Sequence, residues 1–283
     1  MAAVKRTNIM AIVNVSPDSF NGDGIADEKT LRKRIETALS FGADILDVGG
    51  QSTRPGAEII TVEEELQRVL PAIELARQLG DKPISIDTFK PEVAESAIAA
   101  GATIVNDVHG CDDGHMAEVV RDTGIEVVIM HSRGTPSTMS QLTAYPDGVV
   151  AEVIAFFKER TKQLTTEYDI KPERIILDPG IGFAKTATQS FELTQQLHAF
   201  MSLGFRVLYG ASQKSFLGRA LAVNQGEPAP VEDRTTATAV TTTFAMLQGV
   251  NIVRVHDVRA AAEVRRIVQC IEEPSTVERR YVP

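Results

Sequence analysis

Short apolar runs rich in β-branched residues recur along the chain, and each is followed by a polar residue, a loop and a segment with helical periodicity. The apolarity within each run is continuous rather than alternating, which is typical of parallel strands that are covered on both faces. The predicted strands are residues 9–15, 44–48, 84–86, 104–105, 127–130, 175–177, 207–209 and 252–255. The pattern therefore predicts a parallel sheet whose strands alternate with helices.

The intervening segments carry helix start and stop signals. Thr61 and Glu64 form a capping box ahead of an apolar stripe. Pro91 suits the first turn of a helix that closes at Gly101. Pro71 predicts a kink or a break in its helix, because proline lacks an N–H and clashes with the preceding turn. Further helices are predicted over residues 149–164, 233–247 and 260–271.

The number of alternations indicates the fold. Eight strands and their helices within 283 residues favour a closed (β/α)8 barrel, a TIM barrel, as one domain over residues 1–283. An open doubly wound sheet is the structural alternative. That fold often carries a GxGxxG turn after its first strand, and this sequence has none there.

Composition and charge exclude several classes of protein. The formal net charge of −9 argues against binding along a nucleic-acid backbone, although local cations can still hold a small anion. Cys111 and Cys270 fit no metal spacing or disulfide framework, and Cys270 is expected in the core. The sequence shows no signal peptide and no apolar run that could cross a membrane, so we expect a cytoplasmic protein without a membrane partner.

Polar residues stand where the predicted strands end, and in a barrel these ends meet on the face where catalytic groups collect. They are Asn14, Asp47, Asp87, Asn106 with Asp107, His131, Asp178, Lys214, and Arg254 with His256. Any one of them could simply cap a strand, but the whole set predicts a common site. Four of them offer donors and acceptors suited to the edge of a polar heterocycle: Asp87, Asn106, Asp178 and Lys214.

A second group is suited to an anion. Arg side chains grip phosphate oxygens through a planar fork, and an amide oxygen is a hard ligand for Mg²⁺ that bridges phosphates. The group follows the first, second and eighth strands and consists of Asn14, Thr53, Arg54, Arg254 and His256. The structural alternative for Arg254 is an ion pair with Asp257 or another carboxylate.

Three predicted loops are long and rich in turn formers, and they cover residues 16–27, 49–60 and 132–147. Long loops on a rigid barrel are commonly lids or binding loops. The stretch 178–186 turns sharply at a Pro-Gly pair and should leave Phe183 and Lys185 at the rim. Phe183 could then stack on a flat substrate, or it could pack beneath the loop.

The motifs that contain these residues resemble the dihydropteroate synthase family, folate-pathway enzymes that sulfonamides inhibit. The motifs are NVSPDSF at 14–20, STRPGA at 52–57, SIDT at 85–88, NDV at 106–108, MHSRG at 130–134, DPGIGF at 178–183, KSFLG at 214–218 and RVHDV at 254–258. They span nearly the whole chain in the family's order. Each motif alone is weak, and the ordered set is specific.

The resemblance implies a Mg²⁺-assisted transferase that condenses a dihydropterin methyl-pyrophosphate with p-aminobenzoate and releases pyrophosphate. It also implies that C–O cleavage precedes attack by the amine, and that the protein is a homodimer. The implied catalytic residues are Asp87, Asp178, Lys214, Arg254 and His256. The implied pterin-binding residues are Asp87, Asn106, Met130, Asp178, Lys214 and Arg254. Pyrophosphate would contact Asn14, Thr53, Arg254 and His256, with Asn14 as the metal ligand. The implied p-aminobenzoate pocket comprises Arg54, Pro55, Phe183, Ser212 and Lys214.

Departures from the family pattern keep alternatives open. Gln213 stands where an Arg is usual and Gln51 where a Glu is usual, and Asp23 lies in an altered first loop. One alternative is a paralogue that binds a pterin without transferring it. A methyltetrahydrofolate-binding module is disfavoured because it has no need of the first two loop motifs. A Schiff-base aldolase would require Lys214 to have a lowered pKa in a desolvated setting.

Overall fold

The computed structural model describes residues 6–15, 28–52, 57–222 and 226–277. Eight parallel strands follow one another around a closed barrel, and the last strand pairs with the first. The strands are β1 (Asn8–Asn14), β2 (Ile45–Gly49), β3 (Ile84–Asp87), β4 (Ile104–Asp107), β5 (Glu126–Met130), β6 (Ile175–Asp178), β7 (Arg206–Tyr209) and β8 (Ile252–Val255). The predicted closed barrel is therefore confirmed, and the open-sheet alternative is wrong.

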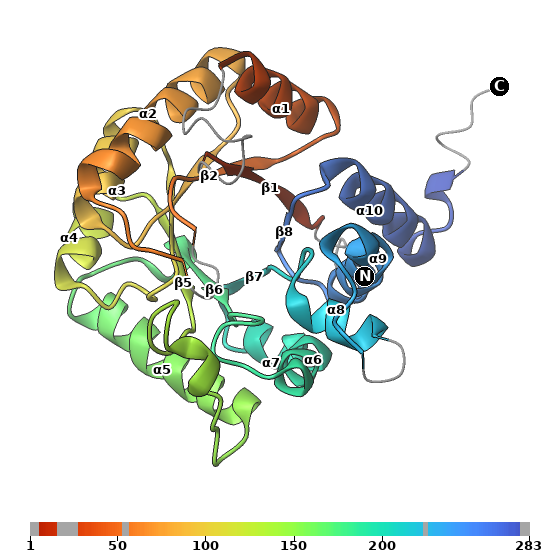
Figure 1. Ribbon diagram of the computed structural model, residues 1–283. Coiled ribbons are helices and arrows are strands. Elements are labelled where there is room, and N and C mark those ends of the chain that lie inside the picture. Colours follow the sequence, from red (N-terminus) through yellow and green to blue (C-terminus); the bar gives the residue numbers. More distant parts are fainter. Residues whose placement is uncertain (1–5, 16–27, 53–56, 223–225, 278–283) are drawn as a thin grey trace.

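Helices form an outer ring around these strands (Figure 1). They are α1 (Glu28–Ser40), α2 (Val62–Leu79), α3 (Pro91–Ala99), α4 (Gly114–Thr123), α5 (Val149–Thr166), α6 (Ala187–Gln195), α7 (Leu197–Met201), α8 (Ser215–Leu221), α9 (Thr235–Leu247) and α10 (Val258–Glu272). Short 3₁₀ turns cover Met139–Gln141, Pro172–Arg174 and Val231–Arg234. No helix among the described residues is long and apolar enough to cross a membrane.

The helix signals in the sequence act largely as expected. The Thr61 hydroxyl accepts a hydrogen bond from the backbone N–H of Glu64, and Pro91 begins its helix. Pro71 does not break α2, which continues to Leu79, so the prediction of a break there is wrong. The Pro71 side chain is exposed, and packing of the neighbouring apolar stripe keeps the helix continuous. Cys270 is half-buried rather than part of the core, whereas Cys111 is fully buried.

Two apolar layers surround the strands. The larger one lies between the barrel and its helices. The smaller one is a separate cluster of buried strand residues, one from each of seven strands: Met10, Ile45, Ile104, Val128, Ile176, Leu208 and Ile252. Side chains alternate along a strand, so this inner cluster identifies which positions point into the barrel.

Candidate active site

The inner cluster ends where a polar layer begins at the carboxyl ends of the strands, which we call the barrel mouth. Besides Ile12, five side chains lie two residues beyond a member of the cluster and therefore point inward as well: Asp47, Asn106, Met130, Asp178 and Arg254. Asn14, Gly49, Asp87 and Asn106 are successive register partners across β1 to β4. The strand ends thus bring the predicted residues to one place.

Arg254 is at the centre of the charged groups in this mouth. Its Nε donates to Asp47 Oδ2 at 2.6 Å, and its Nη2 donates to Asp87 Oδ2 at 2.5 Å. Asp47 is fully buried and Asp87 is 8% exposed, so the guanidinium is the counterion of two desolvated carboxylates. The alternative expectation, an ion pair with Asp257 or another carboxylate, is therefore confirmed for other carboxylates, Asp47 and Asp87. The Asp257 carboxylate caps α10 instead.

Asp87 retains an unused acceptor. Burial raises the pKa of Asp87 to about 7, although Arg254 acts in the opposite direction. Its Oδ1 is buried and has no hydrogen-bond partner among the described residues. An unsatisfied buried oxygen costs free energy, so its presence at the mouth of a barrel indicates an atom that a ligand is meant to contact.

Asp178 and Lys214 occupy the other half of the mouth. Asp178 Oδ1 accepts a hydrogen bond from the Gly180 N–H at 2.8 Å. A Cβ atom at Gly210 would lie 3.8 Å from Arg254 Cβ and 3.9 Å from Asp178 Oδ2, so this glycine leaves the space between them open. Burial raises the pKa of Asp178, and Lys214 lowers it. The two halves of the mouth are therefore electrostatically connected.

Lys214 points back over the loop after β6. Its Nζ donates to the Ile181 carbonyl at 2.5 Å and lies 4.7 Å from the centre of the Phe183 ring. Burial lowers the pKa of Lys214 to about 8, while Asp178 raises it. The lowered pKa is the property that the aldolase alternative required, but the carbonyl bond and the cation–π contact are equally consistent with an ammonium group that holds a ligand in place.

Ser212 and His256 meet beside this mouth. Ser212 Oγ lies 3.0 Å from His256 Nδ1, and the His256 backbone N–H donates to the same hydroxyl at 3.2 Å. The resemblance assigned Ser212 to the p-aminobenzoate pocket and His256 to the pyrophosphate. The structure makes these two side chains direct neighbours.

Several predicted residues lie elsewhere or outside the described residues. Thr53, Arg54 and Pro55 are outside them, as is Asp23. Lys185 was expected at the rim, but it is 8% exposed, so that prediction is wrong. Asp107 points away from the mouth, and its carboxylate accepts the backbone N–H groups of His109 and Cys111.

Asp47 is the functional residue that the sequence did not assign. The sequence placed Asp47 among the polar residues that end strands, but no local signal indicated that it has a different role from Asp107. Its partners Arg254 and Asn106 lie far away in the sequence, and both contact it only in the closed barrel: Asn106 Nδ2 is 3.4 Å from each Asp47 carboxylate oxygen.

Gln51, which stands where the family usually has a charged Glu, lies in a buried polar cluster. Its Oε1 accepts from Lys90 Nζ at 2.8 Å and from the Ile60 N–H at 3.2 Å. Lys90 Nζ also donates to Glu65 Oε2 at 2.5 Å and to the Ile60 carbonyl at 2.8 Å. Glu65 therefore supplies the negative charge that Gln51 lacks, and Lys90 joins both ends of the segment from Gln51 to Ile60.

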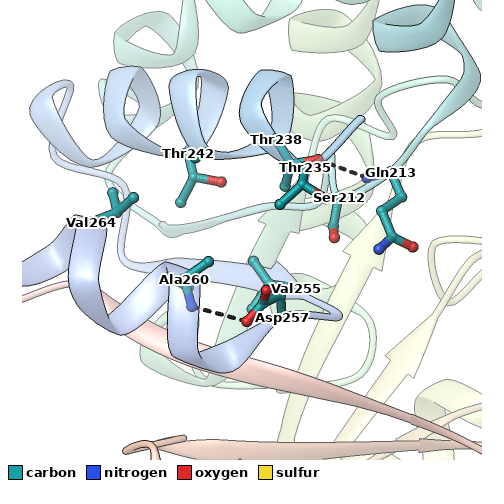
Figure 2. A pocket seen from close by; sticks show the side chains of 11 residues that line it. Ser212, Gln213, Thr235, Thr238, Thr242, Val255, Asp257, Ala260 and Val264 are labelled. Atoms are coloured by element: carbon teal, nitrogen blue, oxygen red, sulfur yellow. Dashed lines mark hydrogen bonds between the residues drawn. The ribbon is translucent and has the colours of Figure 1, made fainter. Parts of the chain in front are cut away.

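Gln213 is held through its backbone. It has a positive φ of 59°, its N–H donates to Thr238 Oγ1 at 3.1 Å, and its carbonyl accepts from Arg234 Nη1 at 2.9 Å. Figure 2 shows it beside Ser212 at the end of a cavity of about 20 Å³ between α9 and α10. That volume suits about one water molecule, so this cavity is not a substrate site.

The predicted magnesium ligand lies close to the acidic groups. A Cβ atom at Gly49 would be 3.5 Å from Asn14 Oδ1 and 3.7 Å from Asp87 Oδ2. Hard oxygen atoms of this kind fit Mg²⁺, which keeps several waters and bridges phosphates. Within residues 6–15, 28–52, 57–222 and 226–277, no three His, Cys, Asp or Glu side chains are grouped to hold a metal. The donors present therefore fit an ion that shares its coordination with a phosphate ligand.

Comparison with known proteins agrees with this geometry. The family model described as "Pterin binding enzyme" matches residues 10–256. The dihydropteroate synthase of Synechocystis sp. is 44% identical over 94% of this chain and 91% of its own. The structure of the Clostridium difficile enzyme with pteroic acid is 39% identical, with a TM-score of 0.84 over 96% of this chain and 98% of that one. The Yersinia pestis enzyme with a sulfonamide drug is 32% identical, with a TM-score of 0.87 over 95% of each chain.

Proposed function

We propose a function for the barrel mouth from the family to which the chain belongs, the pterin-binding enzymes, and within it the dihydropteroate synthases. The residues of the mouth described above are proposed to carry out the dihydropteroate synthase reaction. This transferase of folate biosynthesis joins a dihydropterin methyl-pyrophosphate to p-aminobenzoate and yields dihydropteroate and pyrophosphate, and sulfonamides target it. The observation that best supports the assignment of residues is the set of buried carboxylates around Arg254, with the unpartnered Asp87 Oδ1 among them.

The pterin ring is proposed to lie across the mouth. Asp87 Oδ1 and Asp178 offer acceptors to the N–H groups of its edge, and Lys214 offers donors to its acceptor atoms. Asn106 supplies a neutral amide, and Met130 supplies an apolar surface beside the ring. The register places Met130 opposite Asp178 and Asn106 opposite Asp87, which suits contacts around one flat ligand.

The diphosphate is proposed to lie toward β1 and β8, against Asn14, Arg254 and His256. The resemblance adds Thr53, which lies outside the described residues. Arg254 uses Nε and one Nη2 hydrogen on carboxylates, so its remaining N–H groups can bind oxyanions. Mg²⁺ held with the help of Asn14 would neutralise charge on the leaving diphosphate.

The mouth is suited to breaking the C–O bond before the new bond forms. Departure of pyrophosphate leaves positive charge on the pterin methylene group. Three buried carboxyl groups, Asp47, Asp87 and Asp178, lie near Arg254 and Lys214, and in their ionised form they stabilise that cation. The amine of p-aminobenzoate is already a nucleophile and needs orientation more than a base.

The second substrate is proposed to lie beside Phe183, Lys214 and Ser212. The resemblance adds Arg54 and Pro55, which lie outside the described residues. The Phe183 ring offers a stacking surface, and Lys214 lies over its face. This pocket adjoins the diphosphate side through the contact between Ser212 and His256. The departing and attacking groups would then be neighbours.

Mixing both substrates with Mg²⁺ tests this function. We expect pyrophosphate and dihydropteroate to form in equal amounts, and a sulfonamide to inhibit both. Pterin binding without pyrophosphate release would favour the alternative of an inactive paralogue. In a parallel experiment, Arg254→Ala should weaken pyrophosphate binding far more than binding of a bare pterin, and an equal loss of both would contradict the diphosphate assignment.

We also propose that the protein is a cytoplasmic homodimer. Its two unpaired thiols suit a reducing compartment. Helices α9 and α10 are neighbours in Figure 1 and together expose five large apolar side chains. Their exposed fractions are 62% for Val240, 43% for Phe244, 46% for Leu247, 60% for Ile267 and 59% for Ile271. An apolar surface of this kind supports association with a second copy of the chain.

A further inference from the structure

We propose that Lys185 and His131 form a positioning pair that holds the backbone of Phe183, and so determines how tightly the arylamine substrate binds. This role rests on the proposed function, because it takes Phe183 as part of the p-aminobenzoate pocket. Neither Lys185 nor His131 belongs to the proposed substrate-binding set.

Lys185 Nζ makes three polar contacts, which reach His131 at the end of β5 and Phe183 in the loop after β6. It lies 3.0 Å from His131 Nδ1, and it donates to the His131 carbonyl at 3.2 Å and to the Phe183 carbonyl at 2.9 Å. Lys185 is 8% exposed and His131 is 3% exposed. The three contacts join the end of β5 to the loop after β6, and one of them ends on the residue whose ring lies below Lys214.

His131 is a neutral acceptor in this pair. Burial, with a smaller contribution from Lys185, lowers the pKa of His131 to about 3. Nδ1 of a neutral imidazole can accept a hydrogen bond from the lysine. Three acceptors surround Lys185 Nζ, which is the number of hydrogen bonds that a protonated lysine can donate. Burial lowers the pKa of Lys185 well below its ordinary value, and the nearby Asp178 offsets only part of that shift.

The loop needs to be held because its backbone is unusual. Gly180 and Gly182 have φ of 68° and 80°, and Ala184, which has a side chain, has φ of 48°. A Cβ atom at Gly180 would lie 1.9 Å from the His131 carbonyl oxygen, so the two segments approach as closely as glycine permits. A non-glycine residue at positive φ persists when surrounding contacts stabilise it.

A second set of contacts supports the same loop from the outside. Tyr145 Oη donates to the Ala184 carbonyl at 3.1 Å, and Gln189 Nε2 donates to the Thr143 carbonyl at 2.9 Å. Both bonds join the loop after β5 to residues that follow Phe183. Only Lys185 reaches the Phe183 carbonyl itself among the described residues, so its loss should displace the ring without unfolding the loop.

Lys185→Met tests the role, because methionine keeps much of the side-chain volume and removes all three contacts. We expect the KM for p-aminobenzoate to rise about tenfold, which corresponds to about 1.4 kcal/mol. The KM for the pterin pyrophosphate should change less than about twofold. In a Phe183→Ala background, Lys185→Met should have little further effect on the KM for p-aminobenzoate. The reason is that Lys185 acts through the position of the Phe183 ring, which that background lacks.

His131 provides an independent pair of variants. His131→Leu should raise the KM for p-aminobenzoate, and His131→Asn should restore it, because the Asn amide oxygen can replace Nδ1 as an acceptor. Equal changes in both KM values, an undiminished effect in the Phe183→Ala background, or equal behaviour of the Leu and Asn variants would overturn the role. An inactive wild-type enzyme would instead refute the proposed function itself.

Discussion

Replacing Arg254 with methionine tests whether one guanidinium keeps two buried carboxylates charged. The substitution leaves Asp47 and Asp87 without their counterion, at 0% and 8% exposure. Removing one partner of a buried ion pair typically costs about 3–5 kcal/mol of folding free energy. We expect a loss in that range at pH 8.5, measured by urea unfolding followed by far-UV circular dichroism.

The loss should depend on pH in a defined direction. Without Arg254, the folded-state pKa of Asp87 rises further above the unfolded value of about 3.9, because Arg254 is the group that lowers it. A carboxyl whose pKa is raised by folding destabilises the protein increasingly as the pH rises toward the folded pKa, by about 1.4 kcal/mol per unit for each proton. In the wild type, the pKa of Asp87 is already about 7, so each variant is compared with the wild type at the same pH.

The difference from the wild type should therefore shrink to about 1 kcal/mol at pH 5, where Asp87 of the variant holds a proton and no longer needs a counterion. Arg259→Met is the matched control, because Arg259 pairs with Glu263 in an exposed i,i+4 bridge, with side chains 68% and 60% exposed. That variant should lose less than about 0.5 kcal/mol at either pH. Equal losses for Arg254→Met at pH 5 and pH 8.5, or a loss as small as the control's, would refute the reasoning.

Three further predictions concern binding, pH dependence and assembly. Asp178→Asn should weaken binding of a bare pterin about 100-fold in calorimetry while the fold remains intact, and unchanged affinity would reject its role. The wild-type kcat/KM should fall above pH 8, because burial lowers the pKa of Lys214 to about 8 and the ammonium is lost as the pH rises through that value. Lys214→Arg should remove this alkaline decline even if its rate is lower, and an unchanged decline would assign it to another group. Val240→Glu should convert a dimer into a monomer by light scattering, whereas Leu142→Glu, which changes a 41% exposed side chain in the loop after β5, should not.

Much of the architecture could be predicted from the sequence because it depends on local chemistry. The strand runs, the start of α3 at Pro91 and the extent of α5 agree with the pattern of apolar residues and caps. The gathering of strand-end residues also follows, since parallel strands in a barrel end on one face. Pro71 shows the limit of local reasoning, because tertiary packing keeps α2 continuous through it.

What the sequence alone determined was therefore the order of strands and helices, the barrel, and the polar residues that end each strand. It did not distinguish Asp47 from Asp107, although the first contacts Arg254 and the second supports a turn. The physical reason is that these strands are apolar on both faces, so the hydrophobic pattern does not indicate which alternate residues point inward. Closure and register of the barrel decide that orientation. They also decide that Arg254 pairs with a carboxylate 207 residues away rather than with nearby Asp257, and that Lys185 is buried against His131.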